Sequence, residues 1–265
     1  MSYESILIFD FDGVLCNSIH DSLFTALQAY SDAVPGHKLP WAKGTERTRI
    51  FQFEKENAGF FHQFTDLMPL GNFAQDYFVF LRLLETDSVK SIHSQNDFNT
   101  FKKTLPEEQL RSYEEIFYRN RVGMQNENPD EWVQLLPCFE GMKESIPELA
   151  HRFLLAIATS KDYQSVHLLL NHWDLAKYFS RENILDKDFA ESKREHLVKF
   201  QEEHGIPYSA MHFIDDKLSH LFAVQDLGVQ AYLALWGFNT VREHDLARKS
   251  GFHTLSLEDL PEFGI

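Results

Sequence analysis

The sequence predicts an α/β protein: a Rossmann-like doubly wound parallel sheet whose chain is interrupted by an all-helical segment. Two observations carry this prediction. Short apolar runs alternate with helical patterns before about residue 17 and after about residue 135, and no strand pattern is evident between these points. Such alternation is typical of a parallel sheet covered by helices on both faces. We therefore expect an α/β domain formed by residues 1–16 and 136–265, and an inserted helical domain formed by residues 17–135.

The expected strands are apolar runs without polar alternation, as is typical of strands that are buried on both faces of a parallel sheet. The first run begins five residues after the start of the chain, and the others follow the helical segment. The four runs span residues 6–10, 153–158, 211–214 and 230–235.

The inserted segment is rich in aromatic residues at helical spacing. One stripe runs from Phe53 to Phe64 and a second from Phe73 to Leu84. We interpret both stripes as the core of a helical domain rather than as a ligand cage. Residues 104–107 (TLPE) have the pattern of a capping box, which predicts the start of a further helix there.

Composition restricts the class of function. Lys and Arg number 25 against 40 Asp and Glu, which gives a net charge of −15. Such an acidic chain is not attracted to nucleic acid or to an anionic membrane by its overall charge. We therefore expect neither as a partner. No apolar run approaches the length of a membrane span. Cys16 and Cys138 are too few for a disulfide framework, so we expect a cytoplasmic location.

Four short motifs fall where predicted strands end or helices begin. The first is Asp10-Phe11-Asp12-Gly13, directly after the first strand. In open α/β sheets ligands bind at the carboxyl ends of the strands, although an Asp-Gly turn alone would look the same. The second is Thr159-Ser160-Lys161, whose hydroxyl groups could bind an anionic oxygen or could simply cap a helix.

The third motif is Lys193, at the start of a predicted helix. A cation opposes the helix dipole there by about 0.3–1 kcal/mol, which suggests placement for function, although a solvated lysine is the alternative. The fourth motif is Asp215-Asp216 at the end of another strand. Adjacent carboxylates repel each other, and a cation such as Mg²⁺ would remove this repulsion. The alternative is an ordinary solvated acidic turn.

Together these motifs resemble the haloacid dehalogenase-like hydrolase superfamily, in the branch of phosphoglycolate phosphatase and β-phosphoglucomutase. The resemblance covers residues 4–20 and 135–262. It departs from the common family pattern at Ile214, where a glycine is usual, and at Arg194, where a proline usually follows the lysine. Because of the second departure, Lys161 and Lys187 are weaker candidates for the role that the family gives to the lysine at position 193. The resemblance implies that the helical insertion is a cap domain.

The resemblance also implies a role for each motif residue. Asp10 would be the nucleophile, and Asp12 would be the general acid and base. Thr159, Ser160 and Lys193 would bind the phosphoryl group, with Thr159 and Lys193 counted among the catalytic residues. Mg²⁺ would be the cofactor, held by Asp10, by the backbone carbonyl of Asp12, by Asp215 and by Asp216, although Asp216 could instead orient metal-bound water.

The expected function is therefore Mg²⁺-dependent hydrolysis of a small phosphorylated metabolite through an aspartyl-phosphate, by a monomer or homodimer. Two alternatives stay open. A phosphomutase would use the same chemistry but return the phosphoryl group to a sugar. A non-enzymatic relative would use the helical insertion as an interaction surface.

Overall fold

The computed structural model describes residues 3–190 and 192–264 and divides the chain into two compact units. The α/β unit consists of Met1–Asn17 and Pro137–Ile265, and the helical unit consists of Ser18–Leu136. The chain thus leaves the α/β unit soon after its first strand and returns to it before the second. The boundaries expected from the sequence lie within one residue of these.

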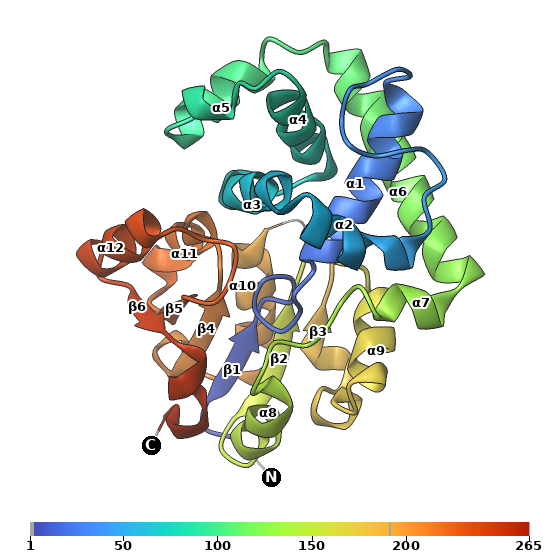
Figure 1. Cartoon of the computed structure of the whole chain (residues 1–265). Helices are drawn as coiled ribbons and strands as arrows, with labels where there is room; N and C mark the ends of the chain where they lie inside the picture. Colours follow the sequence, from blue (N-terminus) through green and yellow to red (C-terminus); the bar gives the residue numbers. More distant parts are fainter. Residues whose placement is uncertain (1–2, 191, 265) are drawn as a thin grey trace. The chain divides into compact units, whose positions relative to one another are not determined.

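The α/β unit contains a six-stranded parallel sheet in the order β3-β2-β1-β4-β5-β6 (Figure 1). The predicted fold class is therefore confirmed. Two of the strands, β3 and β6, have only two and three residues and were not expected from the sequence. The strands are β1 Ile6–Phe9, β2 Leu154–Ala158, β3 Ile184–Leu185, β4 Met211–Asp215, β5 Gln230–Ala234 and β6 His253–Leu255.

The order of the strands creates a switch point between β1 and β4. From β1 the chain passes to β2 and β3 on one side, then crosses to β4, β5 and β6 on the other. Crevices form outside the carboxyl ends of strands at such a point, because successive connections leave in opposite directions. Asp10 directly follows β1 and Asp215 ends β4, so both lie at the switch point.

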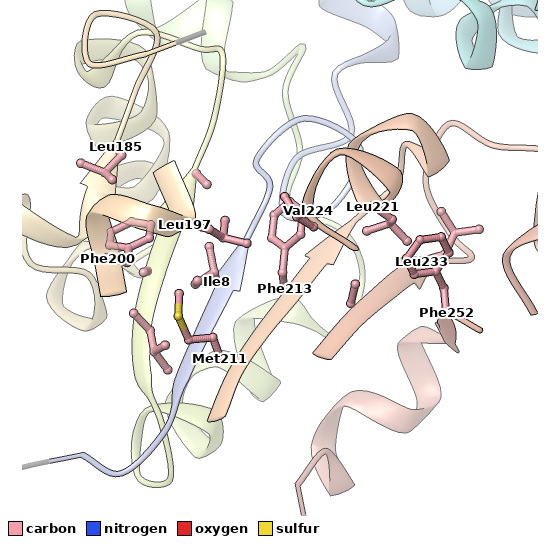
Figure 2. Packing of buried hydrophobic residues seen from close by; sticks show 14 of the residues in the cluster. Ile8, Leu185, Leu197, Phe200, Met211, Phe213, Leu221, Val224, Leu233 and Phe252 are labelled. Atoms are coloured by element: carbon pink, nitrogen blue, oxygen red, sulfur yellow. The ribbon is translucent and has the colours of Figure 1, made fainter. Parts of the chain in front are cut away.

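Helices of the α/β unit pack on the sheet through apolar side chains. On one face, Ile8 of β1 and Phe213 of β4 belong to a buried cluster with Phe200 of α10 and Leu221 of α11 (Figure 2). These side chains exclude water from the centre of the sheet. Their packing also fixes the positions of the helices, which carry polar groups to the edge of the sheet. The helices of this unit are α8 Met142–Ala150, α9 Tyr163–His172, α10 Lys193–His204, α11 Leu218–Val224 and α12 Val241–Lys249.

The helical unit contains no strand among its residues, all of which the structure describes. The first aromatic stripe is divided between two helices at Asn57, rather than lying on one. The expected capping box is wrong: α6 begins at Glu107 with Pro106 as its N-cap, and no side chain caps it. The helices are α1 Ile19–Ala33, α2 Ile50–Glu56, α3 Ala58–Leu67, α4 Ala74–Glu85, α5 Gln95–Lys102, α6 Glu107–Glu127 and α7 Pro129–Val133.

Aromatic rings form the core of the helical unit, as the sequence predicts. Phe64 packs on Tyr77 and Phe80, and Tyr77 stacks on Phe117 of α6 at 5.3 Å between ring centroids. Phe73 is the exception, because it precedes α4 and its side chain is 58% exposed. Rings of both stripes therefore pack between α3, α4 and α6.

No helix within residues 3–190 and 192–264 is both long enough and apolar enough to cross a membrane. Cys16 and Cys138 are free thiols rather than a disulfide.

His196 is a buried titratable residue on α10, and it supplies a test of the packing. Its Nε2 atom lies 3.2 Å from the carbonyl oxygen of Asp186. Burial, together with the nearby charge of Lys193, lowers its pKa from 6.5 to about 4. Because folding favours the neutral ring, this stabilisation is complete above about pH 6.5 and is lost as the pH falls towards 4.

Between about pH 7 and about pH 4.5 the free energy of unfolding of the wild type should fall. In His196→Gln we expect this fall to be smaller by about 2 kcal/mol. Urea denaturation at the two pH values measures this difference. His172→Gln, at an exposed position at the end of α9, is the control, and its free energy of unfolding should change with pH as that of the wild type does. An equal pH dependence in all three proteins would contradict the prediction.

Candidate active site

Asp10 and Asp12 lie on a tight loop that leaves the carboxyl end of β1. The amide of Asp10 still donates to the carbonyl of Ile214 on β4 at 2.9 Å, which continues the sheet by one residue. The chain then turns back, because the amides of Leu15 and Cys16 both donate to the carbonyl of Phe11. The ring of Phe11 stacks on that of Trp173 beneath the loop. Asp10 is thereby held at a fixed point of the switch crevice.

Lys193 reaches this point from the first residue of α10. Its Nζ donates to Oδ1 of Asp10 at 2.5 Å and to the carbonyl of Ala158 at 2.6 Å, and it lies 3.6 Å from Oδ2 of Asp215. Only 4% of the side chain is exposed. Ser192 caps the helix by accepting from the amide of Glu195. Lys193 is therefore not a solvated lysine, and the two carboxylates offset its conflict with the helix dipole.

Opposing charges set the ionisation of this cluster. Burial lowers the pKa of Lys193, but Asp10 and Asp215 more than offset it, so its pKa stands above the ordinary value. Burial raises the pKa of Asp10 to about 6, against the lowering effect of Lys193. Burial likewise acts to raise the pKa of Asp215, yet His220 and Lys193 hold it below the ordinary value. A cation beside Asp10 would lower its pKa and keep it ionised.

Thr159 and Lys161 follow the end of β2, next to β1 in the sheet. Thr159 is buried, and its hydroxyl oxygen accepts from the amide of Lys161 at 3.0 Å. Thr159 does not cap a helix, because α9 begins at Tyr163 with Asp162 as its N-cap. Lys161 Nζ lies 3.1 Å from Oδ2 of Asp12, whereas the lysine that contacts the carboxylate of Asp10 is Lys193. Thr159 and Lys161 thus bring a hydroxyl and a second cation to the same edge of the sheet.

Two other expected residues lie differently. Ser160 is exposed beside the buried Thr159, and Lys187, the second alternative to Lys193, is exposed as well. The structure thus brings Lys193, rather than Lys161 or Lys187, to the carboxylate of Asp10.

The carboxyl group of Asp216 is fully buried beneath the loop at Gly13. Its Oδ2 accepts from the amide of Phe238 at 2.8 Å, while its Oδ1 is buried without a hydrogen-bond partner. Burial raises its pKa well above the ordinary value, and the charges of Asp215 and Asp10 raise it further. A buried carboxyl group with an unpaired oxygen is stabilised by a proton or by a nearby cation.

Gly13 makes this arrangement possible. Its φ is +86°, and a Cβ atom there would lie 2.2 Å from Oδ2 of Asp216. We expect Gly13→Ala to lower the free energy of unfolding by about 3 kcal/mol or more, from backbone strain together with the clash. Gly228→Ala is the matched control in the same unit, because its φ is +81° and nothing lies within 4 Å of its Cβ position. Gly228→Ala should cost only about 1 kcal/mol. Equal losses in urea denaturation would contradict the clash.

Asp10, Asp215 and His220 form a cluster that could hold a metal ion. One ligand atom of each lies within 4.8 Å of the others. His220 Nδ1 lies 3.0 Å from both carboxylate oxygens of Asp215. The carboxylates of Asp12 and Asp216 are outside this cluster. Two buried carboxylates beside a nitrogen ligand, with the unpaired oxygen of Asp216 nearby in the chain, fit a divalent cation such as Mg²⁺.

Sequence reasoning missed His220. It lies in the first turn of α11, five residues after Asp215, and its ring turns back towards the end of β4. A single histidine at that distance matches no metal-ligand spacing. The only available signal was its position just after an acidic motif at the end of a strand.

Comparison with known proteins places the chain among related folds. The structure resembles a haloacid dehalogenase-like family hydrolase from Streptococcus pneumoniae, with TM-score 0.64 and 15% identity over 98% of both chains. It also resembles a predicted phosphoglycolate phosphatase from Haemophilus somnus, with TM-score 0.62 and 17% identity over 100% of this chain and 99% of that one. A predicted phosphatase from Clostridium acetobutylicum matches with TM-score 0.60 and 14% identity over 98% of both chains.

The sequence itself also matches a family model. The model for haloacid dehalogenase-like hydrolases matches residues 74–234 of the 265. This range includes Thr159, Lys193 and Asp215, and Asp10 lies before it. Together with the parallel sheet of the α/β unit, the match confirms the resemblance on which the site was predicted: the chain belongs to the haloacid dehalogenase-like hydrolase family.

Proposed function

We propose that the protein is a Mg²⁺-dependent phosphatase that hydrolyses a small phosphorylated metabolite through an aspartyl-phosphate on Asp10. One observation carries the proposal: the ammonium group of Lys193 lies between the carboxylates of Asp10 and Asp215 at the switch point of the sheet. The family and the names of similar structures, phosphatases among them, support the substrate class. The local positive charge makes an anionic substrate acceptable to a chain of net charge −15.

Asp10 is the proposed nucleophile. A carboxylate oxygen attacks phosphorus, the bond to the leaving oxygen breaks, and the phosphoryl group is transferred to Asp10. Lys193 balances the charge of Asp10 and of the transferring group, while the Thr159 hydroxyl donates to a phosphoryl oxygen, with Ser160 as a further contact. When bound, Mg²⁺ supplies further positive charge to the phosphoryl oxygens; Asp10, the backbone carbonyl of Asp12 and Asp215 would hold it, with Asp216 beside them.

Asp12 is the proposed general acid and base. A leaving alkoxide needs a proton, and the hydrolysis of the aspartyl-phosphate needs a base to accept a proton from water. In the structure Lys161 contacts Oδ2 of Asp12, and its Oδ1 has no hydrogen-bond partner. The 35% exposure of the side chain leaves Asp12 accessible to a substrate.

The helical unit is the proposed cap domain, which would cover the substrate and exclude water. We further propose a cytoplasmic monomer or homodimer. A phosphomutase would share the Asp10 chemistry, and a non-enzymatic interaction protein would need none of it. The buried contacts between Asp10, Lys193 and Asp215 favour an enzyme, because buried charges are costly to maintain without a chemical use.

A screen of phosphorylated metabolites tests this function. The purified protein is incubated with each compound in Mg²⁺ and in excess chelator, and inorganic phosphate is measured. We expect phosphate release that requires Mg²⁺ from at least one small phosphomonoester. Interconversion of two sugar phosphates without phosphate release would identify a mutase instead. The absence of any turnover across the panel would favour the interaction protein.

A further inference from the structure

We infer that His220 is a direct ligand of the divalent cation at this site, so that the site binds ions that accept nitrogen, such as Mn²⁺ and Co²⁺, more tightly than Mg²⁺. The inference rests on the proposed function in one respect, because it assumes that the Asp10 and Asp215 carboxylates bind a cation. It adds a ligand that the predicted set of carboxylates did not include, and a preference among metals that follows from its chemistry.

The geometry places the imidazole nitrogen among the carboxylate oxygens. Nδ1 of His220 lies 3.0 Å from both oxygens of Asp215, and the cluster with Asp10 is within 4.8 Å throughout. Nitrogen and oxygen ligands that share one first-row ion at about 2.0–2.2 Å each lie about 3 Å apart from one another. The separation of His220 and Asp215 therefore already suits a shared ion.

The surroundings leave His220 available for this role. Its side chain is 27% exposed, whereas that of Asp215 is fully buried, so an ion can enter from solvent on the side of the imidazole. Each of the two neighbouring carboxylates has its Oδ2 atom engaged elsewhere, while its Oδ1 atom has no hydrogen-bond partner. Asp216 accepts from the amide of Phe238, and Asp12 contacts Lys161. Within the described part of the chain, His220 is the side chain that joins Asp10 and Asp215 in the cluster.

The identity of the ligands sets the preferred ion. Mg²⁺ is a hard cation that favours oxygen ligands and retains water. Imidazole increases affinity for first-row transition ions, which accept nitrogen more readily. A site of two carboxylates and one imidazole can still hold Mg²⁺ through the carboxylates, but its affinity for Mn²⁺ or Co²⁺ should exceed that of an all-oxygen site.

His220 could instead act only through Asp215. An imidazole that donates to a ligating carboxylate orients that carboxylate without touching the metal. In that case its removal should weaken every divalent ion to a similar degree. The two roles are therefore distinguished by the ratio of the affinities for two metals, and by direct detection of nitrogen on the metal.

The experiment uses Mn²⁺ and Mg²⁺ with the whole protein and no substrate. The electron paramagnetic resonance signal of free Mn²⁺ gives its dissociation constant, and competition gives that of Mg²⁺. Spin-echo modulation by ¹⁴N reports whether a nitrogen is bound to Mn²⁺. The proteins are the wild type, His220→Ala, His220→Asp and, as control, His172→Ala at an exposed position of α9.

We expect ¹⁴N modulation from Mn²⁺ in the wild type and in His172→Ala, and none in His220→Ala or His220→Asp. His220→Ala should weaken Mn²⁺ binding by about tenfold and Mg²⁺ binding by less than about threefold. His220→Asp should restore binding of both ions without the nitrogen signal. Bound Mn²⁺ without ¹⁴N modulation in the wild type, or equal loss for both metals in His220→Ala, would overturn the inference and leave the proposed phosphatase intact. Absence of binding by either ion would overturn both.

Discussion

Replacing Asp10 with Asn should reduce phosphate release by at least about 10⁴-fold while the protein stays folded. The amide is nearly the same size as the carboxylate but cannot attack phosphorus, so no aspartyl-phosphate can form. Asp10→Asn also removes one of two carboxylates next to Lys193, and Asp215 remains to balance its charge. Turnover of the best substrate and the far-ultraviolet circular dichroism spectrum are the two measurements.

The control for this variant is Asp188→Asn, an exposed position in the loop before α10. Asp188→Asn should keep both wild-type turnover and the wild-type spectrum. The mass of the Asp10→Asn protein must be checked after the assay, because deamidation would restore the carboxylate. Full turnover without deamidation would show that Asp10 is not the nucleophile.

Replacing Lys193 with Met should lower the turnover sharply and destabilise the fold at the same time. The variant leaves two buried carboxylates, Asp10 and Asp215, without the ammonium group that separates them. Removal of one partner of a buried ion pair costs about 3–5 kcal/mol of folding free energy. Loss of one group that stabilises the transferring phosphoryl charge costs about 10²–10³ in turnover. Urea denaturation and the phosphate assay measure the two losses.

A second variant distinguishes the ion pair from simple loss of packing. Lys193→Met combined with Asp10→Asn has one buried negative charge fewer, so it should be more stable than Lys193→Met alone. Lys199→Met is the control on the same helix, where the lysine forms a partly exposed pair with Glu203 and should contribute less than about 1 kcal/mol. If Lys193→Met were as stable as Lys199→Met, the buried ion pair would be excluded as a source of stability.

Much of the sheet could be predicted from the sequence because its main strands are continuous apolar runs. β1, β2, β4 and β5 lie within or next to the expected ranges. β3 and β6 could not be found in this way, since two or three residues carry no periodicity. The spacing of the aromatic residues predicted that the inserted segment is helical. The same spacing gave no clear signal of the break at Asn57 between α2 and α3.

The candidate site could be predicted as far as it depends on strand ends. Asp10, Thr159 and Asp215 each follow or end a strand, and neighbouring parallel strands bring such residues together. Other features depend on tertiary packing. The burial of Asp216 beneath Gly13, the contact of Lys161 with Asp12, and the return of His220 to Asp215 all require coordinates.

The most direct test of the account is to trap the phosphoryl group on the protein. Turnover of the best substrate in Mg²⁺ is stopped with acid within milliseconds, and the peptides are analysed by mass spectrometry. The account predicts one added phosphoryl group on Asp10, removed by hydroxylamine and absent from Asp10→Asn. A phosphoryl group on any other residue of the protein, in an enzyme that is turning over, would contradict it.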